Sequence, residues 1–205
     1  MAHQFAELDK TEQKASSQAN PLLDWERTPL ASLRIKERIQ PMAQEFTDAI
    51  ALLKADHRKV EDLFAKFEKA RSGKQAIAET ICNELKIHTL IEEEIFYPAL
   101  KGKIEEDTLA EAYVEHDGAK ILINDIMAGG PDDDFYDAKV KVLSEEIEHH
   151  VKEEEMPSEG MFAQARKTDV DLVALRDQMA ARKAELTNIA ETKGLPPAKP
   201  TVVSS

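Results

Sequence analysis

The chain has 205 residues and a formal net charge of −13 at pH 7, from 40 acidic and 27 basic side chains. A surface this acidic repels phosphate backbones and anionic lipids, so neither nucleic acid nor a membrane is an expected partner. A single cysteine, Cys82, excludes internal disulfides and Cys-rich metal sites, and without an apolar run of ~20 residues or a signal-peptide core the default expectation is a cytoplasmic protein.

Helix-forming residues dominate long stretches of the chain, and the alternation typical of strands is scarce, so an all-α fold is predicted. Residues 1–20 are polar and weakly patterned. Residues 21–41 carry three prolines around Trp25, and Thr28-Pro29 has the form of a helix start. We expect residues 1–41 to form a partly disordered N-terminal extension, with a short helix that lies across the rest of the protein.

Four long helices are predicted after this extension, because apolar residues recur there at helical spacing. Turns that contain glycine separate the helices, and short turns between long helices imply antiparallel neighbours. Residues 42–160 are therefore expected to form an up-down antiparallel four-helix bundle. The predicted helices span about 42–70, 74–100, 104–128 and 134–156.

The C-terminal segment, residues 161–205, is expected to hold an extra helix and a flexible tail. The helix is predicted at about 168–192, where apolar residues recur at roughly heptad spacing and Arg182 interrupts the stripe. We expect it to pack on the bundle, in a monomer or a homodimer. The proline-rich residues that follow have the composition of a linker.

Four histidines and two glutamates are in phase with the apolar face of the bundle helices. Two of the histidines are followed four residues later by a glutamate, and residues at that spacing lie about 40° apart on one helix face. Burying two carboxylates without a cation costs several kcal/mol each, whereas two metal ions would remove that cost. Imidazole with carboxylate suits iron, manganese or zinc. The candidate metal ligands are His57, His88, Glu92, His116, His150 and Glu154.

The candidate ligands repeat at matched spacing in two halves of the bundle, residues 57–92 and residues 116–154. A lone core histidine is usually structural, and a run of glutamates is usually a solvated face. The repetition of the whole pattern favours metal over these readings. Two helical hairpins related by a pseudo-twofold axis would build a dinuclear centre in which each metal receives two histidines and shares both glutamates.

The motifs that carry these residues resemble, in order, those of hemerythrin-like HHE domains. They are DHRKVEDLF at 56–64, HTLIEEEIFYPAL at 88–100, EHDGAK at 115–120 and HHVKEEEMP at 149–157. The resemblance covers about residues 48–160. It implies a non-heme di-iron centre with two iron ions per chain, an oxo or hydroxo bridge, and the six side chains named above as its ligands.

The sequence departs from the oxygen-carrying hemerythrins at two of their ligand positions. Those proteins have a further histidine where this chain has Lys120, and an aspartate five residues after the fourth-helix histidine, where this chain has Glu154 at four. The chain therefore resembles the four-His, two-Glu variant of bacterial proteins linked to iron–sulfur repair and nitric oxide stress. Those repair proteins carry a cysteine-containing N-terminal module, which this sequence lacks.

Three further side chains are expected near the centre without being ligands: Tyr113, Lys120 and Glu61. Tyr113 lies three residues before His116, so its hydroxyl could reach the site, although a tyrosine at the core edge is an equal reading. Lys120 is expected to place its charge beside an anion bound to iron, with Glu61 neutralising it or reaching a metal. The alternative is that both side chains extend to solvent.

Three classes of function remain open at this stage. The first is redox chemistry with dioxygen, hydrogen peroxide or nitric oxide in a stress or iron response. The second is an oxygen or iron sensor, or an iron reservoir, without turnover. The third is a structural bundle that holds zinc. A ferritin-like di-iron site is disfavoured, because its Glu-x-x-His motif occurs only once at a plausible place, at Glu146 and His149.

Overall fold

The computed structural model describes residues 46–203, and every regular element in that range is a helix. The predicted extension with Trp25, and His3, lie outside the described residues. Within them, no helix combines the length and apolar character needed to cross a bilayer.

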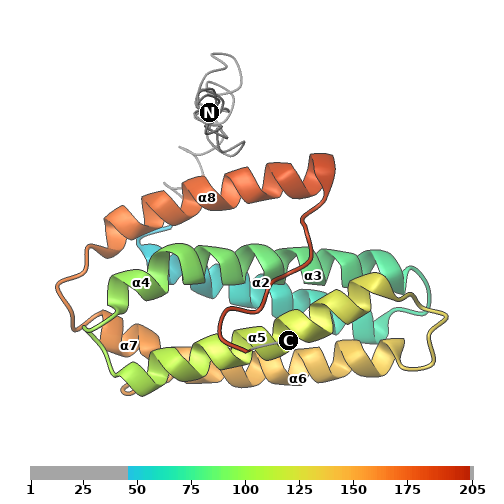
Figure 1. Cartoon of the computed structure of the whole chain (residues 1–205), viewed down its shortest axis with the longest axis horizontal. Coiled ribbons are helices and arrows are strands. Elements are labelled where there is room, and N and C mark those ends of the chain that lie inside the picture. Colours follow the sequence, from blue (N-terminus) through green and yellow to red (C-terminus); the bar gives the residue numbers. More distant parts are fainter. Residues whose placement is uncertain (1–45, 204–205) are drawn as a thin grey trace, which may run out of the picture.

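Four antiparallel helical rods form the bundle, which confirms the predicted all-α, up-down architecture (Figure 1). The first rod begins later than predicted, because the Asp48 side chain accepts a hydrogen bond from the Ala51 amide and caps the helix there. The rods are α2 (Ala49–Lys69); α3 (Lys74–Ile91) continued by η2 and α4; α5 (Glu106–Ala128); and α6 (Tyr136–Glu155).

The second rod changes its winding at the predicted ligand Glu92. A π-helix, η2 (Glu92–Phe96), joins α3 to the short α4 (Tyr97–Leu100). In this stretch the Tyr97 amide donates to the Glu92 carbonyl, five residues back. Such insertions often occur at functional sites, and this one changes which residues after Glu92 face the bundle interior.

The core consists of two apolar clusters separated by a polar layer. Along α2, Leu53 belongs to the cluster near α4 and α7, Val60 belongs to the cluster near the opposite end of the bundle, and His57 lies between them. The other predicted ligands occupy the same layer and are buried with it. The apolar clusters keep water away from both sides of this layer.

Two further helices follow the bundle, α7 (Met161–Ala165) and α8 (Leu172–Lys193). The short α7 is not predicted from the sequence. It begins after Gly160, where a Cβ would lie 2.6 Å from the Met156 nitrogen and 2.7 Å from the Glu154 carbonyl oxygen, so the chain can pass the end of α6 only with glycine. As expected, α8 packs on the bundle, across α2 and α3 (Figure 1).

The C-terminal tail, residues 195–203, is extended but lies against the bundle. It leaves the end of α8 and crosses α3 to reach α5 (Figure 1). Lys86 on α3 donates to the Leu195 carbonyl, and Asn124 on α5 exchanges two hydrogen bonds with the backbone of Ala198. The linker-like composition therefore did not reveal that specific side chains hold the tail.

Candidate metal centre

The structure brings all six predicted ligands into one buried cluster, in which no residue is more than 5% exposed. The histidines form two pairs whose Nε2 atoms are 3.2 Å apart, and the two glutamates lie between the pairs. One pair is His57 with His88, and the other is His116 with His150.

Each glutamate contacts one histidine of each pair. Glu92 Oε2 lies 3.2 Å from His88 Nε2 and 3.4 Å from His116 Nε2. Glu154 Oε2 lies 3.3 Å from His57 Nε2 and 3.7 Å from the Nε2 atom of the other α6 ligand, His150. Each carboxylate thus contacts both histidine pairs, as a group shared between two metal ions would.

The outer nitrogen of every ligand histidine faces a carboxylate. His57 Nδ1 lies 2.8 Å from Glu155, and His116 Nδ1 lies 2.9 Å from Glu93. These two glutamates directly follow the two candidate bridging glutamates in the sequence, so they are equivalent under the pseudo-twofold axis. Such contacts fix the tautomer that leaves Nε2 free to bind a metal.

The other two histidines show the same equivalence. His150 Nδ1 lies 2.8 Å from Glu115, the residue before the α5 ligand His116. His88 Nδ1 lies 3.6 Å from Asp56, the residue before the α2 ligand His57, which is longer than a direct hydrogen bond. The pseudo-symmetry of the sequence therefore extends from the ligands to the carboxylates behind them.

The buried glutamate oxygens test whether a metal fits this cluster. Among the described residues, neither oxygen of Glu92 nor Oε2 of Glu154 has a hydrogen-bond partner. A buried carboxylate in this state carries a desolvation cost of several kcal/mol, which two cations between the histidine pairs would remove. The donors and their burial fit a dinuclear metal centre.

The comparisons with known proteins agree with this geometry. The family model described as hemerythrin, hemerythrin HHE cation-binding domain, matches residues 48–162, which is more than half of the chain.

The chain belongs to this family.

Two individual proteins are similar to it. The solved structure of a hemerythrin HHE cation-binding domain-containing protein from Mycobacterium kansasii, an Rv2633c homolog, is 26% identical, with a TM-score of 0.60 over 73% of this chain and 96% of that one. A protein of Nostoc sp. (strain PCC 7120) named DNA nickase is 30% identical over 107 residues, 51% of this chain. The match covers 30% of that protein's length, so this chain spans less than a third of it.

The carboxylates of this HHE centre determine the protonation of its histidines when no metal is bound. Burial disfavours a charged imidazole at His57, but the neighbouring carboxylates of Glu154 and Glu155 outweigh it and raise the pKa of His57 to about 10. At His116, burial is likewise outweighed by two carboxylates, those of Glu92 and Glu93, and the pKa of this histidine is raised to about 9. A metal ion must displace these protons, so metal affinity should increase with pH.

Tyr97 is the aromatic residue of the centre that the sequence analysis missed. Its hydroxyl donates to Glu154 Oε1 at 3.1 Å and lies 3.2 Å from His116 Nε2. Its ring stacks on His116, with centroids 5.4 Å apart. Burial and the neighbouring carboxylates raise its pKa well above the usual value, so the phenol keeps its proton.

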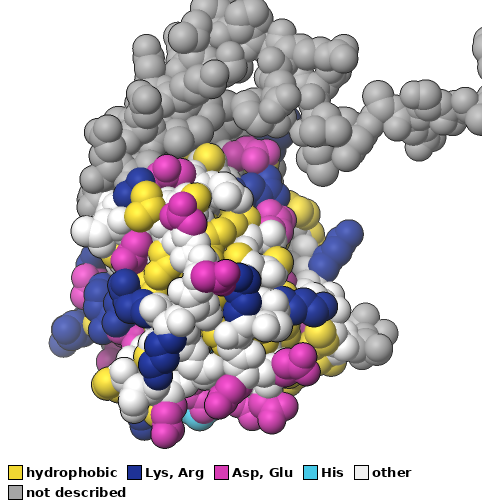
Figure 2. Space-filling model, turned by 90° about the vertical axis from the view of Figure 1, so that its left-hand side faces the viewer, with side chains coloured by type: hydrophobic (Ala, Val, Ile, Leu, Met, Phe, Trp, Pro, Cys, Tyr) yellow, Lys and Arg dark blue, Asp and Glu magenta, His cyan; other side chains and the backbone are white. Residues whose placement is uncertain are grey.

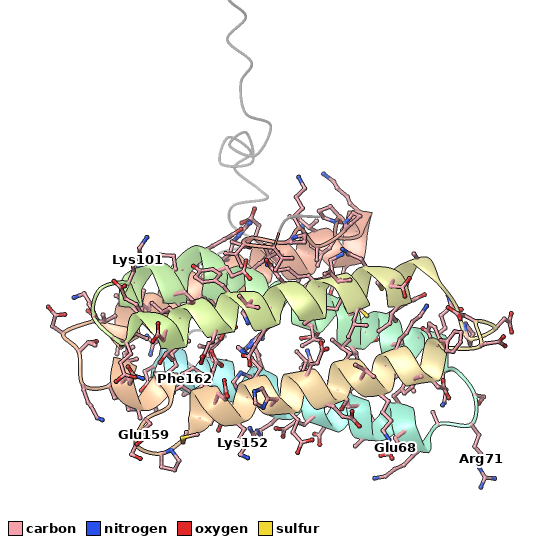
Figure 3. All side chains as sticks on the ribbon, turned by 60° about the horizontal axis from the view of Figure 1, so that its bottom comes forward. Glu68, Arg71, Lys101, Lys152, Glu159 and Phe162 are labelled. Atoms are coloured by element: carbon pink, nitrogen blue, oxygen red, sulfur yellow. The ribbon has the colours of Figure 1, made fainter. Side chains whose placement is uncertain are left out.

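The pseudo-twofold symmetry is broken at this position. On the other side of the centre the ring that stacks on His57 is Phe162 of α7, at 5.8 Å between centroids (Figure 3). A phenyl ring has no hydroxyl, so only the His116 side of the centre has a phenolic proton. The two sides of the cluster therefore differ chemically.

Of the two readings of Tyr113, the structure agrees with a tyrosine at the core edge. Tyr113 is half-buried and packs edge-on against the Tyr97 ring, with centroids 5.3 Å apart. No hydrogen bond joins its hydroxyl to the six candidate ligands in the part of the chain that the structure describes. Tyr97 stands between Tyr113 and the site.

The predicted pairing of Lys120 with Glu61 is wrong. Lys120 is buried, but its ammonium contacts Glu93 and Asp117 behind His116 rather than the inner face of the centre. Its charge is therefore already neutralised. Glu61 is exposed and pairs with Arg58 on the surface of α2, as the solvent-exposed alternative predicts for it.

Two other residues lie outside the cluster of candidate ligands. His149 is exposed and pairs with Glu153 and Glu115 on the surface, so it is not one of the clustered ligands. Cys82 is a buried residue of the apolar core, and burial raises the pKa of its thiol to about 12. A thiol with this pKa is neither a reactive nucleophile nor a thiolate ligand.

Proposed function

We propose that this chain is a non-heme di-iron protein that binds or reacts with dioxygen, hydrogen peroxide or nitric oxide, in a stress or iron response. The observation that carries the proposal is the position of the two buried glutamates, each of which contacts both histidine pairs and has at least one oxygen without a hydrogen-bond partner. One iron would be held by the His57 pair and the other by the His116 pair.

The protein groups around the centre have separate tasks in this proposal. Bound iron would supply electrons and open positions for a small ligand. The outer carboxylates orient the imidazoles, the two apolar clusters exclude water, and the Tyr97 hydroxyl holds a proton between Glu154 and His116. That proton is available on one side of the centre only.

A sensor without turnover is the second candidate, and one contact favours it. Glu93, which hydrogen-bonds to His116, also accepts a hydrogen bond from Thr201 of the C-terminal tail. A change at this histidine could therefore reach the surface of the protein through two hydrogen bonds. Turnover of peroxide or nitric oxide by the iron-loaded protein would show that it is an enzyme rather than a sensor.

The proposal includes no nucleic acid or membrane partner. The net charge of −13 is unfavourable for both. At the end of the bundle formed by α4 and α7, acidic and basic side chains are interspersed with hydrophobic ones, without a continuous basic surface (Figure 2). The activity implied by the name of the Nostoc relative is not carried over, since most of that protein has no counterpart here.

The proposal predicts two iron ions per chain in protein produced with ample iron. The six donors and two shared carboxylates suit a dinuclear centre, and oxo-bridged di-iron absorbs near the ultraviolet–visible border whereas zinc does not. Metal analysis with an absorption spectrum measures both. One ion per chain, or a colourless zinc protein, would contradict the proposed centre.

Tyr97→Phe is predicted to keep both metal ions but change the reaction with peroxide or nitric oxide by about tenfold or more, a typical effect of removing a group that hydrogen-bonds to metal ligands. Metal content and stopped-flow rates give the two measurements. Tyr113→Phe is the matched control, because its ring lies farther out on the same side. Equal effects of the two substitutions would remove Tyr97 from the proposed mechanism.

A further inference from the structure

A surface groove of about 590 Å³ lies between α2 and α6. Phe64 and Val140 contribute to its apolar floor, and Glu68 lies on its α2 side (Figure 3). Two further floor residues, Ile147 and Val151, lie one turn apart on α6 and flank the ligand histidine of that helix. The groove therefore approaches the metal centre from one side.

A small enclosed chamber of about 10 Å³ lies against the four ligand histidines. Its remaining walls are largely apolar and include Val60, Leu85, Ile147 and Val151. Only Ile147 and Val151 line both the chamber and the groove, and they are 8% and 6% exposed. A volume of this size holds about one water-sized sphere, so only a very small molecule fits against the histidines.

The pseudo-twofold axis relates this groove to the gap between α3 and α5. The residues equivalent to the two shared floor residues are Leu85 and Thr89, and each is 2% exposed. The C-terminal tail crosses this gap, hydrogen-bonded to Lys86 on α3 and to Asn124 on α5. Among the described residues, one of the two equivalent approaches is thus covered by the tail, and the groove between α2 and α6 is left open.

The rim of the open groove is acidic. Five carboxylates and two lysines line it, and the lysines pair with two of the carboxylates, Lys74 with Asp137 and Lys141 with Glu145. The resulting negative rim repels anions, and the apolar floor disfavours any hydrated ion. An uncharged molecule meets neither barrier.

We propose that the groove between α2 and α6 admits a small uncharged molecule to the histidine side of the centre, with Ile147 and Val151 as its gate. This inference rests on the proposed di-iron function and adds the route by which its small ligands reach the centre. It selects dioxygen, nitric oxide or hydrogen peroxide over anions such as superoxide or nitrite.

The first test needs no iron. Dissolved dioxygen is paramagnetic and broadens the NMR signals of methyl groups near the sites that it visits. In diamagnetic protein, metal-free or loaded with zinc, the methyl groups of Val60 and Leu85 in the chamber should broaden more than those of Leu143 and Ile123, which are also buried but do not line the chamber. Equal broadening at all of these methyl groups would overturn the route.

The second test measures nitric oxide binding to the reduced, iron-loaded protein by stopped flow. Ile147→Trp should slow association about tenfold, because a close-packed interior offers few other routes, and Ile147→Ala should speed it. Val142→Trp, on the exposed face of the same helix, is the matched control and should leave the rate unchanged. If the tryptophan variant at the gate does not fold, Val151→Ala replaces it and should also speed association.

The two tests separate the route from the function. If the chain holds no iron, the di-iron function fails, while the dioxygen broadening still decides whether the chamber is reached. If iron-loaded protein binds nitric oxide at a rate that no gate variant changes, the route is wrong and the function stands.

Discussion

Glu92→Ala and Glu154→Ala are each expected to lose both metal ions rather than one. Each carboxylate contacts a histidine of both pairs, so its removal takes a ligand from both metal positions at once. Removal of a histidine would directly affect only one position. Metal analysis after production with ample iron measures the loss, and a variant that retained two ions would show that the altered glutamate is not a bridge.

Two controls separate metal binding from folding in this experiment. Glu94→Ala and Glu153→Ala remove exposed neighbours of the two glutamates and should keep two ions per chain. Glu92→Gln keeps the shape of the side chain but removes its charge, so the bundle should remain helical by circular dichroism while metal is lost. A glutamine variant with full metal content would mean that the charge at this position is dispensable.

The cluster of candidate ligands could be predicted from the sequence because its residues lie where the α-helical period holds. His57, His116 and His150 are in regular α-helices, and the step from His88 to Glu92 ends just as the π-helix begins. Their phase relative to the apolar residues is therefore preserved in the structure. The same regularity made the four-helix bundle predictable.

Tyr97 was missed because the period changes after Glu92. In an α-helix, five residues advance about 500°, which would turn Tyr97 away from Glu92. The π-helical hydrogen bond between these two residues instead brings the fifth residue back over the first, so both side chains face the centre. No residue in the run marks this change of winding, and Tyr113 therefore seemed the better placed tyrosine.

The carboxylates that face the Nδ1 atoms of the histidines could have been found from the sequence. Each of them is adjacent in sequence to a ligand, at equivalent positions in the two halves: Asp56 and Glu115 before a histidine, Glu93 and Glu155 after a glutamate. A run of glutamates usually forms a solvated face, so the sequence favours the surface for Glu93 and Glu155. The structure instead turns both side chains toward imidazole nitrogens. The contact of Lys120 with the tail left no such signal, since Thr201 is 81 residues away in the chain.

Asp117→Ala is expected to lower the free energy of unfolding by about 2–4 kcal/mol, because it removes a buried acceptor from several donors at once. The Asp117 carboxylate is fully buried and accepts hydrogen bonds from the backbone amides of Thr201, Val202 and Val203. It also accepts one from the Lys120 ammonium. The substitution should therefore release the tail from α5, which hydrogen exchange at the three amides would reveal.

The pKa of Asp117 adds a pH dependence to this prediction. Burial alone would raise that pKa, but the backbone hydrogen bonds of the tail outweigh it and lower the pKa to about 2. A carboxyl group with a depressed pKa contributes stability above its unfolded value, about 3.9, and loses it as the pH falls toward 2. The tail should stay bound at pH 5 and detach in strong acid.

Asp125→Ala, on the exposed face of the same helix, is the matched control for Asp117→Ala and should change the free energy of unfolding by no more than about 0.5 kcal/mol. Equal losses at the two aspartates, measured by urea unfolding, would show that the tail contacts contribute nothing specific.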